Sequence, residues 1–308
     1  QKLCGDVSVD RAGNLVCFRR GKDPMKPGVL VAAHMDEIGF MVTGHTEDGL
    51  LRFKPVGGVD PRVAVSKWVI IGRERIPGVI GALAIHLQTP ADREKVLDYD
   101  QLFIDIGAAD AKEAEKLCPV GTYAVFDTPY AEFGEGLVSA RALDDRVGCW
   151  SLLKVLQSDY AGDLYCVFVT QEEVGLRGSR AAAFTAQPEY ALVLEGTAAN
   201  DLGNVQPREQ VCVPGQGVAV SFMDLASIAD RETYRRMLSI AREEGIPYQI
   251  KRGITGGNDA ASFQRVGRGA RTCVLSVPCR YIHSGVSVAS LKDIQAQADL
   301  ACAFLKSL

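Results

Sequence analysis

The chain has 308 residues, of which 47% are hydrophobic and 23% charged, so it can bury a large core, is not a disordered protein and has the length of roughly two domains. Its 34 Lys and Arg against 38 Asp and Glu give a formal charge of −4, which excludes the basic surplus typical of nucleic-acid binders. No apolar run approaches the ~18 residues that a membrane span needs, and no signal-peptide pattern precedes the first strand.

Buried strands and amphipathic helices alternate along most of the chain. Continuous apolar runs predict strands that are covered on both faces, and apolar residues at helical spacing predict helices packed over them. This alternation is typical of the α/β class. In chain order, we expect a strand over 28–34, a helix over 146–158, strands over 164–173 and 190–197, a helix over 230–244, a strand over 271–284 and a helix over 290–305 capped by Ser290.

Residues 38–128 have a different rhythm. They contain many short β-like segments that Gly and Pro separate, and only residues 110–117 have the pattern of a helix. Such a rhythm indicates a small β-rich domain. Because the segment lies between a strand that ends at His34 and a helix that starts near Asp144, we interpret it as an insertion into the α/β domain.

Ionisable residues follow the ends of the predicted strands, where open α/β sheets place their functional sites. A further acidic pair comes directly before the predicted helix at 146–158. Two histidines and several carboxylates suit borderline divalent metals such as zinc, cobalt or manganese. The residues concerned are His34 with Asp36, Glu172 with Glu173, Glu195, His283, and the pair Asp144–Asp145.

His34 and Asp36 are two residues apart on one strand, so their side chains point to the same side. A metal-bound imidazole usually donates its other N–H to a carboxylate, and Asp36 is placed to accept that bond. The alternative is a core histidine beside a solvated Asp.

Glu172 and Glu173 are adjacent at a strand end, where the chain turns and both side chains can approach one site. Two carboxylates at one site repel each other unless a cation or a proton separates them. One division of roles puts Glu173 on the metal and makes Glu172 the general base on a metal-bound water. The alternative is a solvated pair that begins a loop.

Asp144 and Asp145 precede the helix at 146–158 and are candidates for its N-cap. A carboxylate can also bridge two metal ions ~3.5–4 Å apart. The two hypotheses are compatible, because Asp145 can cap the helix while Asp144 bridges the metals.

Other features carry no chemistry of their own. The sequence has no G-x-S-x-G, no phosphate-binding P-loop and no G-x-G-x-x-G after a strand. The Gly-rich loop at 253–260 lacks a phosphate-binding Lys, and we interpret Asp259 as structural. His45 lies in a polar turn, and we expect it to be solvated.

The nine cysteines include no C-x-x-C pair, which argues against a structural zinc ribbon. Several, such as Cys166, lie in apolar runs. We interpret them as buried free thiols of a reducing compartment, which predicts a cytoplasmic location.

Several motifs occur in an informative order. AHMDEIGF, ALDDRVG, TQEEVGLRGS, LEGT and RYIHS together resemble the dinuclear metallo-aminopeptidases of peptidase family forty-two, which include the tetrahedral (TET) and glutamyl or deblocking aminopeptidases. IPGVIGALAIHL and LFIDIGA resemble the inserted β domain of that family. The resemblance runs from about residue 13 to the C-terminus. It implies a three-layer α/β/α metallopeptidase domain over 1–37 and 129–308, with an inserted, barrel-like oligomerisation domain over 38–128.

The resemblance also implies a role for each candidate residue. His34 is similar to the first metal's histidine and Asp36 to the carboxylate that orients it. Asp144, the first Asp of LDDR, is similar to the bridging ligand and Glu172 to the general base. The remaining ligands are Glu173 and His283 for the second metal, and Glu195 for the first, where the family usually has an Asp.

The implied activity is the removal of N-terminal residues from short peptides by a water that two divalent metals activate, with zinc as the first choice and cobalt or manganese as alternatives. The implied assembly is a homo-oligomer, a dodecamer with a dimer as the fallback, without nucleic-acid or membrane partners. A related amidase or deacylase of small N-acyl substrates, and a non-catalytic peptide- or sugar-binding descendant, are the alternatives. The chain starts with Gln and lacks the helix that family members usually carry before the strand near residues 10–17, so we interpret it as a fragment or as having lost its beginning.

Overall fold

The protein was analysed as a computed structural model, which describes residues 3–308. The chain forms two compact units. The sheet unit consists of the residues up to Asp36, Ala131–Ile282 and Val288–Leu308, and the barrel unit consists of Glu37–Tyr130 and His283–Ser287.

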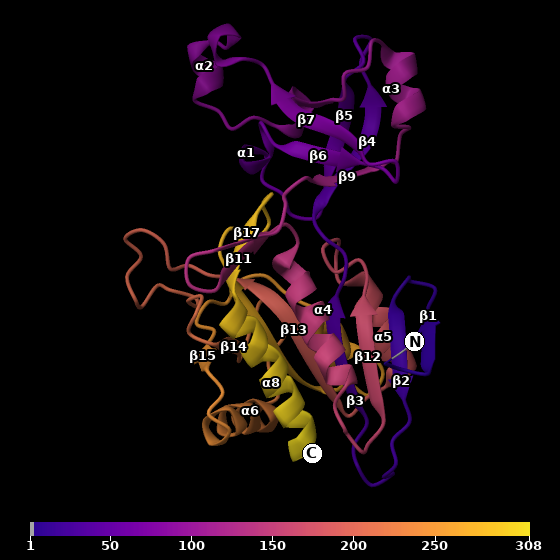
Figure 1. The fold of residues 1–308 in the computed structure, drawn as a ribbon, viewed down its shortest axis with the longest axis vertical. Coiled ribbons are helices and arrows are strands. Elements are labelled where there is room, and N and C mark those ends of the chain that lie inside the picture. The colour runs from indigo at the N-terminus through magenta and orange to yellow at the C-terminus, as the bar shows by residue number, and fades with distance from the viewer. Residues whose placement is uncertain (1–2) are drawn as a thin grey trace. The chain divides into compact units, whose positions relative to one another are not determined.

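A mixed sheet is the framework of the sheet unit (Figure 1). Its four central strands, in the order β12, β3, β13 and β16, run parallel, whereas β2 and β14 pair antiparallel to the two ends of this group. Within the described residues, the order is β1-β2-β12-β3-β13-β16-β14-β15. The strands are β1 (Asp6–Val9), β2 (Leu15–Arg19), β3 (Val29–His34), β12 (Leu164–Val169), β13 (Tyr190–Ala198), β14 (Val218–Ser221), β15 (Tyr248–Ile250) and β16 (Arg271–Cys279).

Helices cover both faces of this sheet, which confirms the predicted three-layer α/β/α class. Side chains of β3 alternate between the two apolar layers: Val31 and Ala33 pack with the first set of helices, and Leu30 and Ala32 with the second. A strand buried on both faces has no polar positions, which explains the continuous apolar run in the sequence. The first set is α4 (Leu143–Leu156), α6 (Arg231–Glu243) and α8 (Leu291–Ser307), and the second is α5 (Arg177–Ala186) and α7 (Ala260–Arg265).

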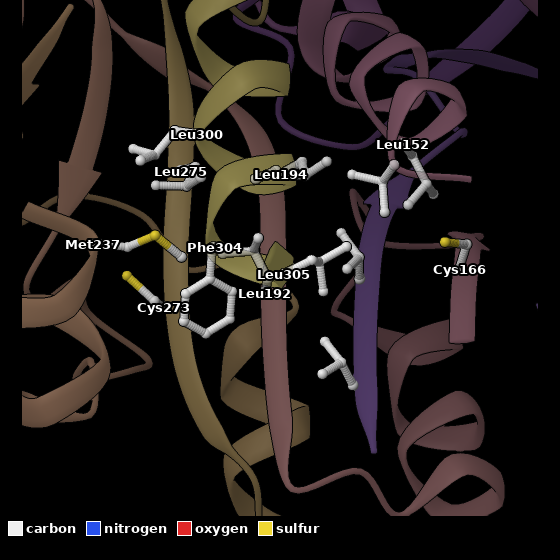
Figure 2. Close-up of a cluster of buried hydrophobic side chains, with 14 of the residues drawn as sticks. Leu152, Cys166, Leu192, Leu194, Met237, Cys273, Leu275, Leu300, Phe304 and Leu305 are labelled. Atoms are coloured by element: carbon white, nitrogen blue, oxygen red, sulfur yellow. The ribbon is translucent and has the colours of Figure 1, made fainter. Parts of the chain in front are cut away.

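The larger core lies between α8 and the sheet. Figure 2 shows Leu300, Phe304 and Leu305 of α8 beside Leu192 of β13 and Leu275 of β16. All of these side chains are 1% exposed or less. This face therefore holds the closing helix against the two strands that lead towards the candidate site.

The barrel unit is built from short antiparallel strands. Six of them within the described residues close into a barrel in the order β4-β5-β8-β7-β6-β9, around the packed rings of Phe40, Phe53 and Phe126. The elements are β4 (Gly39–His45), β5 (Leu51–Val56), α1 (Pro61–Ala64), β6 (Trp68–Ile71), β7 (Ile76–Ala82), α2 (Pro90–Arg93), β8 (Leu102–Asp105), α3 (Ala111–Leu117) and β9 (Tyr123–Phe126). The predicted barrel-like fold of this segment is thus confirmed. Helix α3 begins after Asp110, whose carboxylate accepts a hydrogen bond from Glu113 N.

Most predicted elements are present, with informative differences. The strand expected to reach residue 173 ends at Val169, so Glu172 and Glu173 lie in the turn that follows. Ser290 stands at the N-cap position of α8, but its side chain makes no capping bond. Helices α5 and α7 were missed, because the former buries mostly Ala and Gly instead of large apolar residues and the latter has only six residues. The small strands β10 (Ala131–Phe133), β11 (Leu137–Ala140) and β17 (Ser287–Ser290) were missed as well.

The structure also bears on the expectations about the cysteines and about membrane-spanning segments. All nine cysteines are free thiols, and most of them are buried, as predicted. In residues 3–308, no helix combines the length and the apolar character that crossing a membrane requires.

Truncating the core side of α8 should destabilise the protein. Phe304 is 1% exposed, so Phe304→Ala should lower the free energy of unfolding by about 3–5 kcal/mol through lost burial and a residual cavity. Phe184→Ala is the control, because that side chain on α5 is 70% exposed. Denaturant unfolding measures both, and equal effects in the two variants would contradict the packing described for α8.

Candidate functional site

The site centres on His34, the last residue of β3, whose side chain is 1% exposed. Its Nε2 atom lies 3.3 Å from Asp144 Oδ1 and 3.6 Å from Glu195 Oε2. Its Nδ1 atom faces Asp36 instead, 3.2 Å from the main-chain oxygen and 3.6 Å from Oδ1. One ring nitrogen therefore points at two carboxylates from other elements, and the opposite nitrogen at a neighbour on its own chain segment.

Asp144 and Asp145 have non-helical backbone angles at the start of α4. Asp145 Oδ1 accepts a hydrogen bond from Gly148 N (3.0 Å), which makes Asp145 the cap of the regular helix, and Oδ2 accepts from His34 N (3.2 Å). A Cβ at position 148 would lie 2.4 Å from the Asp145 carboxylate, so glycine is required there. With Asp145 engaged in this way, the Asp144 carboxylate faces the imidazole.

Glu172 and Glu173 are brought to His34 by the Asp36 carboxylate. Its two oxygens accept the backbone N–H groups of Glu172 (3.1 Å) and Glu173 (3.2 Å). Asp36 therefore contacts the imidazole and also fixes the turn after β12. The pKa of Asp36 is lowered: burial by itself raises it, but the bonds from His34 and the two backbone N–H groups outweigh that effect.

Sequence reasoning missed the residue that supports this turn from the other side. Asn14, which is fully buried, accepts Thr170 N at its Oδ1 (2.9 Å) and donates from Nδ2 to Gly178 O (2.8 Å). Asn14 Nδ2 also donates to Asp10 Oδ2 (2.7 Å), but Thr170 and Gly178 are more than 150 residues away in the chain, so no local pattern predicted these two contacts. Asn14 clamps both ends of the segment that carries Glu172 and Glu173.

The electrostatics of the site are those of an acidic cluster without a cation. Burial by itself lowers the pKa of His34, but bonds and charges from Asp144, Asp36 and Glu195 raise it well above its usual value. Burial raises the pKa values of Glu195 and Asp145 well above the ordinary range. It also raises the pKa of Glu172 to about 9, helped by neighbouring carboxylates. Protonation of these carboxyl groups, or a bound cation, lowers the repulsion between them.

Two sets of side chains have the geometry to hold a metal ion. His34, Asp144 and Glu173 offer ligand atoms within 4.8 Å of one another, and His34, Asp145 and Glu195 do the same. Imidazole and carboxylate donors suit zinc, manganese and cobalt. Among the described residues, the buried Glu195 Oε1 has no hydrogen-bond partner, which fits a carboxylate that awaits a cation.

His283 belongs to the barrel unit, where its Nδ1 lies 3.0 Å from Gly58 O. The contacts above bring together the other six predicted site residues and do not include His283, so its ligand role stays a prediction.

His45, which we expected to be solvated, is half-buried. Its Nε2 lies 2.8 Å from Cys118 O, because the end of β4 packs beside the end of α3.

Asp259, interpreted as structural, is fully buried directly before α7. Burial raises its pKa to about 6, although the Ser179 hydroxyl and the charge of His34 lower it. It is therefore a buried acid close enough to His34 and Asp36 for their charges to act on it.

This arrangement can be compared with known proteins. A sequence model of the M42 glutamyl aminopeptidase family matches residues 13–300, which is most of the chain. The chain belongs to this family. The protein is therefore an aminopeptidase, a hydrolase that acts on peptide bonds. The family is metal-dependent, in agreement with the acidic and imidazole donors around His34.

Individual relatives match this aminopeptidase over nearly their whole length. The lysyl aminopeptidase of Pyrococcus furiosus is 33% identical, with 99% of this chain and 88% of the relative covered. An aminopeptidase structure from the archaeon Desulfurococcus kamchatkensis has a TM-score of 0.94 at 34% identity, covering 100% and 87% of the two chains. The TET1 peptidase of Pyrococcus horikoshii, which can assemble into a tetrahedron or a large octahedral shell, has a TM-score of 0.83 at 35% identity, covering 97% and 88%.

Metal binding to the aminopeptidase should strengthen as the pH rises. The pKa values of His34 and Glu195 lie well above their usual values in the metal-free protein, so both groups hold protons that a metal must displace. We expect affinity for Zn²⁺ to rise by about tenfold per pH unit for each displaced proton between about pH 6 and 8.

Calorimetry in two buffers of different ionisation heat measures the affinity and the protons released. His45→Gln, in the barrel unit, should keep the same slope, whereas an affinity independent of pH would contradict the protonation described for His34.

Proposed function

We propose that this aminopeptidase removes N-terminal residues from short peptides with two divalent metal ions per subunit, zinc being the first choice and cobalt or manganese the alternatives. The observation that carries the proposal is the orientation of His34. Its Nε2 faces the Asp144 and Glu195 carboxylates at 3.3 and 3.6 Å, while Nδ1 faces Asp36. This is the arrangement of a metal-binding imidazole oriented by a second acid.

In the proposed ligand set, His34 and Glu195 would hold one metal, Glu173 and His283 would hold the other, and Asp144 would be shared by both. The position of Asp144 supports this set. Its carboxylate lies close to a ligand atom of Glu173, and it approaches the same imidazole nitrogen as Glu195 does. Asp145 is assigned to capping and to His34 N, because both of its oxygens already accept backbone hydrogen bonds.

Glu172 is the proposed general base. When bound, the metal ions supply Lewis acidity and lower the pKa of the attacking water. The Glu172 carboxylate takes the proton from that water and then donates it to the leaving amine nitrogen. The pKa of Glu172 is about 9 in the metal-free protein, chiefly because of burial, and nearby positive charge lowers a carboxyl pKa. The same group is thus poised to release and to accept a proton.

Replacing this base should remove turnover without removing the metals. Glu172→Gln keeps the size of the side chain but cannot accept a proton, so kcat should fall by at least ~10²-fold while the metal content stays near that of the wild type. Steady-state assays with aminoacyl chromogenic amides and elemental analysis measure the two quantities. Glu47→Gln, at an exposed position of the barrel unit, is the matched control. Near wild-type turnover in Glu172→Gln would remove Glu172 from this role.

The proposed assembly is a homo-oligomer, a dodecamer with a dimer as the fallback, in which the inserted domain of residues 38–128 joins subunits of the catalytic domain of residues 1–37 and 129–308. Support comes from the segment between β7 and α2, where Leu83, Ile85 and Leu87 are 56, 59 and 71% exposed. Exposed apolar side chains close together favour association. The shells of the related TET1 peptidase agree with this proposal, and nine free thiols support a reducing, cytoplasmic location.

Association should depend on these side chains. Light scattering on the purified chain should give an oligomer over the micromolar range, and Leu87→Glu should shift it towards smaller species, because a charge would be buried at the contact. Glu74→Gln, at an exposed turn of the same unit, serves as the control. A monomer throughout the range would contradict the assembly, and a stable dimer would contradict the dodecamer alone.

A further inference from the structure

Behind the candidate site, a polar side chain is buried in the otherwise apolar core beneath α8. Gln297 is fully buried, and so is its neighbour Ser151 on α4. The Ser151 hydroxyl donates to Gln297 Oε1 (2.7 Å). The amide nitrogen of Gln297 donates to two carbonyls, Glu195 O (3.0 Å) and Leu275 O (2.8 Å). One side chain therefore connects α4, β13, β16 and its own helix.

Burying the Gln297 side chain in these apolar surroundings costs free energy, and its hydrogen bonds hold it rigidly. Figure 2 shows Leu152, Leu194, Leu275 and Leu300 in the apolar cluster on this face of the sheet. In the sequence, Leu152 follows Ser151 and Leu194 precedes Glu195. A buried amide in such surroundings must satisfy its hydrogen-bonding groups or destabilise the protein. Gln297 uses both ends of its amide, so its rotamer and the three partner groups are fixed together.

The elements that Gln297 joins are those that carry candidate ligands. Helix α4 begins with Asp144, and β13 carries Glu195. Pairing of β13 with β3 ends at the Val193–Ala32 pair, two residues before Glu195. Glu195 therefore does not pair with β3, whereas its pairing with β16 continues. The Gln297 amide adds a hydrogen bond to the main chain at the residue where support from β3 has ended.

We propose that Gln297 is a positioning residue for the metal centre: it fixes the main chain of Glu195 relative to α4, and with it the separation of the Glu195 and Asp144 carboxylates. This inference rests on the proposed role of Glu195 as a metal ligand. Ser151 contributes by holding the Gln297 amide in the orientation that turns its nitrogen towards the strands.

The test measures metal affinity on the full, metal-free chain, with Zn²⁺ as the probe and calorimetry as the readout. Gln297→Met keeps the length of the side chain and removes all three hydrogen bonds, so affinity should fall by about 10- to 100-fold, as for other residues that orient metal ligands. Ser151→Ala removes one of the three bonds and should give a smaller loss. It also serves as the second variant if Gln297→Met does not fold.

Two controls separate positioning from general stability. Gln295 lies on the exposed side of α8, where its amide donates to Asp299, so Gln295→Met should bind Zn²⁺ like the wild type. Leu300→Ala leaves a cavity in the same core without touching the polar contacts, so it should lower the melting temperature but not the affinity.

A third variant distinguishes the two proposals. Glu195→Gln should lose affinity if Glu195 is a ligand, and unchanged binding in that variant would overturn the ligand assignment together with this inference. If Glu195→Gln loses affinity while Gln297→Met does not, the positioning role is wrong and the ligand assignment stands. An equal loss in Leu300→Ala and Gln297→Met would also overturn the positioning role.

Discussion

Crowding of buried carboxylates around one imidazole is the constraint on which the rest of this structure depends. His34, Asp145 and Glu195 are almost completely buried, and Asp144 approaches the same ring. Charges of one sign cannot share a dry site unless protons or cations compensate them. Burial raises the pKa values of Asp145 and Glu195, and neighbouring carboxylates raise that of His34, so protonation of these groups is favoured when no cation is bound. The site is therefore matched to divalent cations by its electrostatics as well as by its ligand types.

In the α/β fold, separate backbone segments supply the side chains of this cluster. The end of β3 supplies His34 and Asp36, the start of α4 supplies the Asp pair, and the turn after β12 supplies Glu172 and Glu173. Two of the carboxylates near His34 accept backbone N–H groups. Asp145 accepts from His34 N and Gly148 N, and Asp36 accepts from Glu172 N and Glu173 N. These bonds fix the acids that surround the imidazole, so little reorganisation is needed when a cation enters.

A second layer of polar contacts lies farther from the imidazole, in the apolar layer under α8. Asp293 accepts Gly217 N at 2.7 Å and Gly215 N at 2.6 Å, and Gln297 reaches the strands one turn later. A buried polar side chain is costly to place but admits one arrangement of its partners. Apolar packing alone tolerates small shifts between a helix and a sheet. These hydrogen bonds instead fix the position of α8 relative to β13 and β16, and the geometry of the candidate ligands depends on that position.

Much of this protein follows from local patterns in its sequence. The continuous apolar runs determined β3, β13 and β16, because strands covered on both faces need apolar residues throughout, and the order of the short motifs determined the family. Helical spacing likewise located α6 and α8. Ionisable residues at strand ends pointed to His34 and Glu195, and the acidic pair before a predicted helix pointed to Asp144.

Tertiary structure decided what those patterns leave open. It placed Asn14 under the turn of Glu172 and Gln297 under Glu195, and it gave His45 a partner at the end of α3. It also separated the capping role of Asp145 from the position of Asp144, whose carboxylate faces His34. The sequence determines which segments are buried through short-range periodicity. Most of these polar partners belong to chain segments far apart in the sequence, by 73 residues for His45 and Cys118 and 156 for Asn14 and Thr170, and only the packed fold brings such segments together.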